Sequence, residues 1–271
     1  MYKKFIVSRL ITEGRVRRGY LGIGGQVTVI SFSIPENAIG FWKDRLTEHH
    51  ISYQEPFTRF DEEVITFRDP DGIQLELVAD ENFPEIEWED TTITPQKAIR
   101  GIHSTTLALK DYEQTGKLLS ENFNFQLIKE SGNRKRFYSG KKQVGSVIDL
   151  LHLPKVDSGR MGAGSVHHIA WRISDKSTQL KKREELIDLG YQVSSVMDRN
   201  YFHSIYFREK GNVLFEIATD LPGFLIDESK EELGLNLKLP KWFEPDRLKI
   251  EASLPEINIP DSNSVNGKNK V

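Results

Sequence analysis

Three stretches of the chain alternate apolar and polar residues as half-buried strands do. They begin at residues 26, 101 and 165 and read QVTVISFSIP, GIHSTTLAL and SVHHIAWRIS. Each is followed by a segment with apolar residues at helical spacing, and then by three short strand-like stretches. This succession predicts three βαβββ modules, at about residues 24–80, 99–154 and 164–220.

The first and third modules repeat each other. The closing stretch VITFRDPDGIQLELVAD of the first corresponds to SIYFREKGNVLFEIATD of the third, so that Phe67 matches Phe207 and Glu76 matches Glu216 about 140 positions later. A constant offset over such a length indicates tandem copies of one unit. We therefore expect an α+β fold in which tandem βαβββ modules form cupped mixed sheets.

An odd number of modules leaves one without a companion and its sheet edge exposed. We interpret residues 1–23, which carry a basic excess, as a remnant or linker of a truncated first module. Residues 81–98 are predicted to be a linker. Residues 221–271 are predicted to be a C-terminal extension that ends in a disordered tail, because the last residues are polar and without periodicity.

Composition narrows the classes of function. The 271 residues are 38% hydrophobic and 28% charged, with a net charge of −3, so no basic excess points to nucleic acid. No apolar run reaches the roughly 18 residues that span a bilayer. The chain has no cysteine, which excludes disulfides, thiolate ligands and a thiol nucleophile. We expect a cytoplasmic protein without nucleic-acid or membrane partners, in which histidines and carboxylates hold any metal.

The third module offers such ligands on its opening and closing strands. Alternation places His168 on one face of its strand and His167 on the other, which we expect to pack against a helix. Glu216 lies in an apolar strand, where a carboxylate is costly unless it is paired or binds a metal. Imidazole and carboxylate suit Fe(II) or Mn(II). An ordinary half-buried strand histidine remains an alternative.

Three further residues complete the candidate set. Tyr206 lies ten residues before Glu216 and could donate a hydrogen bond or act as an acid or base, although cross-strand packing is an alternative. His203, in the loop before that strand, could shuttle protons or be a surface histidine. His103 is a weak candidate for a third metal ligand, because Ser104 holds the ligand position of its module and alternation turns His103 to the other face.

Several motifs resemble one known family. The sequence DPDG at residues 69–72, followed by Glu76, is similar to the closing motif of glyoxalase, bleomycin-resistance and extradiol dioxygenase modules. The stretches GIH, GRMGAG, VHHIAW, YFHSIYFR and LFEIATD resemble those of bacterial ring-cleaving dioxygenases of the vicinal oxygen chelate superfamily that handle catechols or hydroquinones. The resemblance covers roughly residues 15–256.

The resemblance implies that His168 and Glu216 are metal ligands and that Tyr206 is the active-site tyrosine. It implies an Fe(II) enzyme, with Mn(II) as the other metal, that inserts O₂ into a small aromatic diol next to a hydroxyl group. It also implies an opening module with a further histidine that this chain lacks, and hence a weakened enzyme that could form a homo-oligomer.

Two positions depart from the pattern of the family. Lys210 and Asn212 stand where the extradiol signature has proline and glycine. Two other functions remain open: a glyoxalase-type lyase or isomerase, and a metal-free binding protein.

Overall fold

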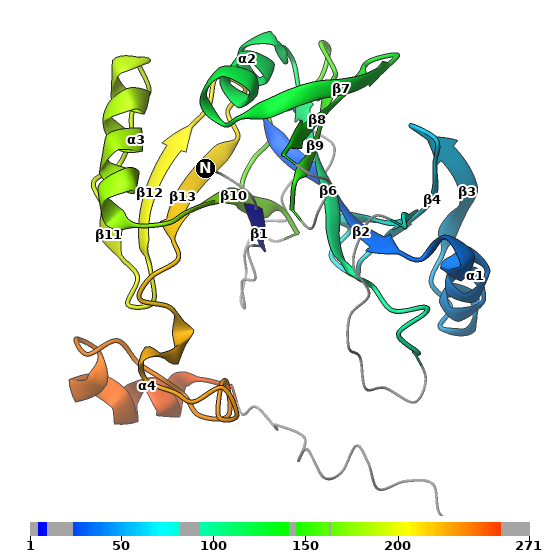
Figure 1. The fold of residues 1–271 in the computed structure, drawn as a ribbon. Helices are drawn as coiled ribbons and strands as arrows, with labels where there is room; N and C mark the ends of the chain where they lie inside the picture. The colour runs from blue at the N-terminus through cyan, green and yellow to red at the C-terminus, as the bar shows by residue number, and fades with distance from the viewer. Residues whose placement is uncertain (1–4, 10–23, 82–92, 141–144, 163, 256–271) are drawn as a thin grey trace, which may run out of the picture.

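The computed structural model describes residues 5–9, 24–81, 93–140, 145–162 and 164–255. Within these ranges the strands form two curled sheets (Figure 1). One sheet has eight strands in the order β3-β4-β5-β2-β6-β9-β8-β7, and the other has five in the order β1-β10-β13-β12-β11. The predicted α+β architecture with cupped mixed sheets is confirmed.

The eight-stranded sheet is built from the first two predicted modules. They join where the two opening strands, β2 and β6, pair antiparallel. The first module comprises β2 (Gln26–Ile34), η1 (Glu36–Ala38), α1 (Ile39–Glu48), β3 (Tyr53–Arg59), β4 (Glu62–Arg68) and β5 (Gln74–Ala79). The second comprises β6 (Gly101–Leu109), α2 (Glu113–Asn122), β7 (Phe125–Ser131), β8 (Arg134–Ser139) and β9 (Val147–His152).

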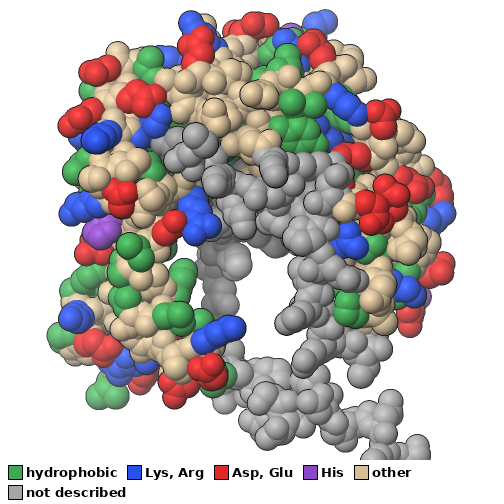
Figure 2. All heavy atoms as spheres, viewed as in Figure 1, with side chains coloured by type: hydrophobic (Ala, Val, Ile, Leu, Met, Phe, Trp, Pro, Cys, Tyr) green, Lys and Arg blue, Asp and Glu red, His purple; other side chains and the backbone are tan. Residues whose placement is uncertain are grey.

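The five-stranded sheet contains the third module and one strand from the N-terminal segment. Strand β1 (Phe5–Arg9) runs antiparallel to β10, as β2 runs antiparallel to β6. The module comprises β10 (Val166–Ile173), α3 (Lys176–Asp188), β11 (Met197–Asp198), β12 (His203–Arg208) and β13 (Leu214–Thr219). The chain continues through η2 (Phe224–Ile226), η3 (Glu244–Asp246) and α4 (Arg247–Ser253), where hydrophobic side chains lie at the surface among charged ones (Figure 2).

Much of the predicted linker and tail lies outside the described residues, as do residues 10–23. The reading of residues 1–23 as a remnant of another module stays a prediction. None of the helices in the described ranges is both long and apolar enough to cross a bilayer.

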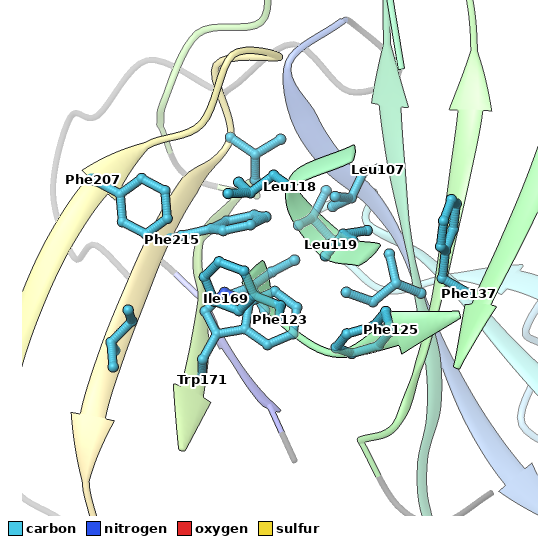
Figure 3. Packing of buried hydrophobic residues seen from close by; sticks show 14 of the residues in the cluster. Leu107, Leu118, Leu119, Phe123, Phe125, Phe137, Ile169, Trp171, Phe207 and Phe215 are labelled. Carbon is cyan, nitrogen blue, oxygen red and sulfur yellow. The ribbon is translucent and has the colours of Figure 1, made fainter. Parts of the chain in front are cut away.

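The main apolar core lies between the two sheets and takes up one set of side chains from β10. Helix α2 is followed by Phe123, which packs its ring 5.0 Å from that of Trp171 and 6.0 Å from that of Phe215 (Figure 3). Ile169, Trp171 and Ile173 of β10 all enter this core. Because side chains alternate along the regular part of a strand, the residues that alternate with these three, from His168 to Arg172, emerge on the opposite face.

Helix α3 covers the core face of the five-stranded sheet. Asp175 caps its first turn by accepting a hydrogen bond from the backbone N–H of Thr178 at 2.9 Å. Gly190, with φ of +83°, follows its last turn, where a left-handed residue commonly ends a helix. The cap fixes where the helix starts.

Candidate functional site

His168, Tyr206 and Glu216 meet on the face of the five-stranded sheet that is turned away from the core. In the parallel pair β10–β13, Ala170 lies opposite Glu216. In the antiparallel pair β12–β13, Tyr206 lies opposite Glu216. Residues opposite each other project to the same face, and His168 is two positions before Ala170 on that face.

The three side chains are in direct contact. Nε2 of His168 lies 2.6 Å from Oε2 of Glu216, and the Tyr206 hydroxyl donates to Oε1 of Glu216 at 2.7 Å. Ser204 also donates to Oε1. The Glu216 side chain is 4% exposed and that of His168 is 12% exposed. The imidazole and the carboxylate therefore converge in a nearly buried position.

The hydrogen bonds around Glu216 decide its charge. Burial alone would raise the pKa of Glu216, but the hydrogen bonds from His168, Ser204 and Tyr206 outweigh it and hold this pKa below its ordinary value. Burial, together with the neighbouring Glu216 carboxylate, raises the pKa of Tyr206. At neutral pH the site thus presents a carboxylate beside a protonated phenol.

Two further side chains contact these residues, and one of them, Arg199, was missed by the sequence reasoning. Nδ1 of His167 lies 2.8 Å from Nδ1 of His168, so His167 is partly exposed beside the site and not packed under a helix as predicted. Arg199 approaches the Tyr206 hydroxyl at 3.5 Å and holds its guanidinium 5.5 Å from the centre of the ring. Ser204 could have been predicted from the sequence, because it lies two residues before Tyr206 and strand alternation places both side chains on the same face.

The chemistry of this donor set fits a divalent metal ion. Two ligand atoms bound at about 2.1 Å in cis positions of an octahedron lie about 3 Å apart, close to the observed separation of His168 Nε2 and Glu216 Oε2. Burial first, and the neighbouring His168, lower the pKa of His167, which favours a neutral ring. A neutral His167 can accept from Nδ1–H of His168, which leaves Nε2 free to ligate.

His203 does not reach this cluster. It is the first residue of β12, and its side chain points to the face opposite that of Ser204 and Tyr206 because neighbours in a strand alternate. There it lines a pocket beside the start of α3, with Asp175 and Lys176. The prediction of a proton shuttle at the metal is therefore not supported by its position.

His103 is also brought elsewhere, to the eight-stranded sheet. The expectation that it faces away from the concave side is wrong, because β6 carries a bulge at this point. Ser31 lies opposite Ser104 and Phe32 lies opposite Ile102, which makes His103 the extra residue. His103 Nδ1 lies 3.0 Å from the Ser104 hydroxyl, and Nε2 faces Glu62 and Asp80. It is not a third ligand beside His168 and Glu216.

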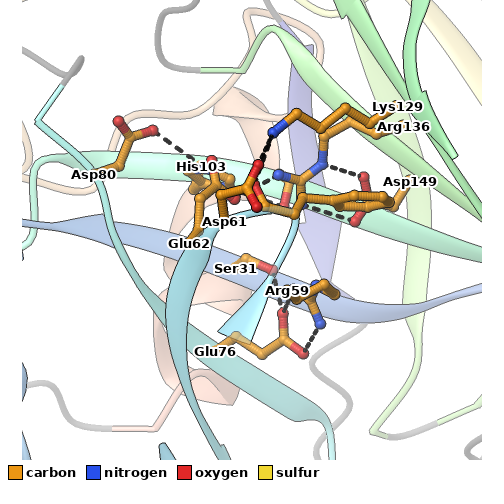
Figure 4. A network of polar contacts seen from close by, with 12 residues as sticks. Ser31, Arg59, Asp61, Glu62, Glu76, Asp80, His103, Lys129, Arg136 and Asp149 are labelled. Atoms are coloured by element: carbon orange, nitrogen blue, oxygen red, sulfur yellow. Dashed lines mark hydrogen bonds and ion pairs between the residues drawn. The ribbon is translucent and has the colours of Figure 1, made fainter. Parts of the chain in front are cut away.

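In the other two modules, the carboxylate at the position of Glu216 is paired with an arginine and not with a histidine. Glu76 and Asp149 occupy the strand positions of Glu216, since each lies opposite the residue equivalent to Ala170. Arg59 binds both oxygens of Glu76, and Arg136 binds both oxygens of Asp149, at 2.7 and 3.0 Å (Figure 4).

The equivalents of His168 in these modules are Val29 and Ser104, as the sequence repeat predicts. Glu76 is 1% exposed and Asp149 is fully buried, so neither faces a solvent-filled cup. Burial would raise the pKa of both carboxyls, and the guanidinium groups more than reverse this, so both pKa values are lowered. At these two positions of the eight-stranded sheet, the carboxylates are therefore held by ion pairs with arginines.

The chain is similar to proteins of one known superfamily. The family model of the Glyoxalase/Bleomycin resistance protein/Dioxygenase superfamily matches residues 101–217. MhqO of Bacillus subtilis (strain 168), a candidate ring-cleaving dioxygenase, is 42% identical over 238 residues, which are 88% of this chain and 75% of MhqO. The chlorohydroquinone/hydroquinone 1,2-dioxygenase of Sphingobium indicum is 30% identical over 243 residues, 87% of this chain and 75% of that enzyme.

Solved structures give the same picture. The crystal structure of a candidate dioxygenase from Bacillus subtilis is 41% identical and superposes with a TM-score of 0.83 over 90% of this chain and 77% of that chain. Glyoxalase I from Zea mays, at 13% identity and a TM-score of 0.55 over 73% of this chain and 69% of that chain, shares the fold alone.

Proposed function

The chain belongs to the glyoxalase/bleomycin resistance protein/dioxygenase superfamily, and on that premise we propose that it is a metal-dependent, extradiol-type dioxygenase. Its substrates would be small aromatic diols of the catechol or hydroquinone class, together with O₂. The observation that carries the proposal is the convergence of His168, Tyr206 and Glu216 on one face of the sheet. The names of the relatives support ring cleavage as the reaction.

We propose that His168 and Glu216 would hold Fe(II), or alternatively Mn(II). When bound, the ion would supply Lewis acidity and adjacent positions for the diol and O₂. Within the described part of the chain, these two side chains bring an imidazole nitrogen and a carboxylate oxygen within 2.6 Å of each other.

The remaining side chains would orient the substrate and its protons. The raised pKa of Tyr206 keeps its hydroxyl protonated, so it can donate to a diol oxygen once Glu216 turns toward a metal. Arg199 is exposed beside Tyr206 and offers positive charge at the rim of the site, where a phenolate would enter. The core under β10 keeps these strands rigid, which favours a defined orientation of the substrate.

Oxygen consumption tests this function directly. Protein reconstituted anaerobically with Fe(II) should take up O₂ when catechol or hydroquinone is added, with about one O₂ per ring-opened product. The competing functions predict other results. A lyase or isomerase would convert a substrate without using O₂, and a binding protein would retain the aromatic compound unchanged. Absence of O₂ uptake with a range of diols in excess Fe(II) would overturn the proposal.

Replacing Tyr206 with Phe should lower turnover by about 100-fold while the melting temperature stays within a few degrees. The substrate would lose the hydrogen bond from the tyrosine hydroxyl, whereas Glu216 would keep its contacts with His168 and Ser204. Steady-state kinetics and a thermal melt measure both quantities. Tyr201→Phe is the matched control, since that hydroxyl binds Asp227 outside the site. Unchanged turnover with a large fall in melting temperature would show that Tyr206 serves packing.

A further inference from the structure

We propose that Glu62, Asp80 and His103 form a second divalent-cation site, separate from the pair of His168 and Glu216. The site lies in the concave face of the eight-stranded sheet, where Figure 4 shows the three side chains turned toward one another. Its donors are one imidazole nitrogen and two carboxylate oxygens. Such a set suits a first-row ion such as Mn(II) or Zn(II), because Ca²⁺ and Mg²⁺ sites are built from oxygen alone.

The spacing of the donor atoms matches a coordination polyhedron. Nε2 of His103 lies 3.2 Å from Oε1 of Glu62 and 3.3 Å from Oδ2 of Asp80, and all three ligand atoms lie within 4.8 Å of one another. Ligands bound at about 2.1 Å lie about 3.0 Å apart in an octahedron and about 3.4 Å apart in a tetrahedron. An ion can therefore reach all three atoms with little movement of the side chains.

The β-bulge is what brings the histidine to this place. In a regular strand His103 would point away from the concave face on which Ser104 lies, but as the extra residue of the bulge it turns toward it. Glu62 begins β4 and Asp80 directly follows β5. The His103 side chain is fully buried and that of Asp80 is 1% exposed, so two carboxylates and an imidazole converge in a nearly dry position.

Neighbouring groups orient the ligands as they do in metal sites. Nδ1–H of His103 can donate to the Ser104 hydroxyl at 3.0 Å, which leaves Nε2 as the ligating atom. The second oxygen of Glu62 accepts a hydrogen bond from Arg136, so Oε1 faces His103. Arg136 is in turn held by Asp149. Both the imidazole and the Glu62 carboxylate are thus fixed in the required direction.

The site also has an entrance. A pocket of about 230 Å³ is lined by Glu62 and Asp80 together with Phe60, Lys129, Arg136 and Tyr138. The pocket can admit an ion and leaves room for water as a further ligand. Because Glu62 and Asp80 belong to the first module and His103 to the second, a bound ion would cross-link the two modules and stabilise the folded chain.

Mn(II) binding to the Glu216→Gln protein tests this proposal without interference from the other site. Electron paramagnetic resonance should count about one bound Mn(II) per chain, and pulsed spectra should show the nitrogen of a single imidazole ligand. Adding Asp80→Asn should weaken binding by at least about tenfold. Mn(II) should also raise the melting temperature of the Glu216→Gln protein, and less so when Asp80→Asn is present.

Asp61→Asn is the matched control. Asp61 is adjacent to Glu62 and pairs with Lys129, but its side chain is 89% exposed and is not a ligand. This substitution removes the same charge and should leave Mn(II) binding unchanged. Failure of the Glu216→Gln protein to bind Mn(II), absence of the nitrogen signal, or equal weakening by Asp61→Asn would each overturn the site. Oxygen uptake by the unmodified chain is measured separately, so failure of the proposed dioxygenase function would be distinguished from failure of this site.

Discussion

On the proposed function, replacing Glu216 with Gln is expected to prevent most of the iron from binding to the chain and to lower ring-cleavage activity by about 100-fold or more. The neutral amide matches the carboxylate in shape but cannot supply its negative charge to the ion. His168 would then be left as a single protein ligand at that position. Fold should persist, because Ser204 and Tyr206 can both donate to the amide oxygen that remains.

Metal content of anaerobically purified protein, measured by elemental analysis before and after addition of Fe(II), is the decisive quantity. Asp220→Asn serves as the control, since Asp220 directly follows β13 and pairs with Arg172 at the surface. It removes one carboxylate from the same end of the sheet without touching the site. Equal iron content in the Glu216→Gln protein and in the unmodified protein would refute the assignment of Glu216 as a ligand.

Replacing Arg136 with Met should lower the free energy of unfolding by about 3–5 kcal/mol. Arg136 is 1% exposed and binds both oxygens of Asp149, which is itself fully buried. Methionine fills a similar volume but leaves Asp149 with only the weaker contact to Arg134, at 3.1 Å. A buried carboxylate without sufficient compensation is the main source of the expected loss.

Urea unfolding in the presence of a chelator, followed by tryptophan fluorescence, gives this free energy without any contribution from bound metal. Lys43→Met is the control, because the ion pair of Lys43 with Glu55 lies at the surface and should contribute less than about 1 kcal/mol. Adding Asp149→Leu to Arg136→Met should restore part of the loss, since it removes the buried charge. A cost below about 1 kcal/mol for Arg136→Met alone would show that the arginine network does not stabilise the sheet.

The fold could be predicted from the sequence because each module begins with a strand in which apolar and polar residues alternate, and because the modules repeat one another. The convergence of His168, Tyr206 and Glu216 follows from the same rule. Once β10, β12 and β13 are adjacent, alternation alone decides which side chains share a face.

The errors have equally physical causes. A bulge adds one residue to β6 and reverses the direction expected for His103, and alternation gives no sign of such an insertion. His203 was predicted to lie in a loop, but it is the first residue of β12. Strand alternation, which places its side chain on the face opposite Tyr206, was therefore not applied to it. Arg136 lies on β8, next to the strand of Asp149, whereas Arg59 lies on β3, two strands away from Glu76 on β5. The pairing registers of these strands set which arginine meets which carboxylate, and a single sequence does not reveal them.

The position of the middle module has a consequence for how the chain can come apart. Through β6 it continues the hydrogen-bonded ladder of the first module, and through Phe123 it shares an apolar core with Trp171 and Phe215 of the third. The middle module is therefore joined to the first module by backbone hydrogen bonds and to the third by apolar packing. Local unfolding of residues 99–154 would break the eight-stranded sheet and would also expose the apolar core shared with the third module to water. We therefore expect the three modules, although similar in pattern, to unfold together as a single cooperative unit.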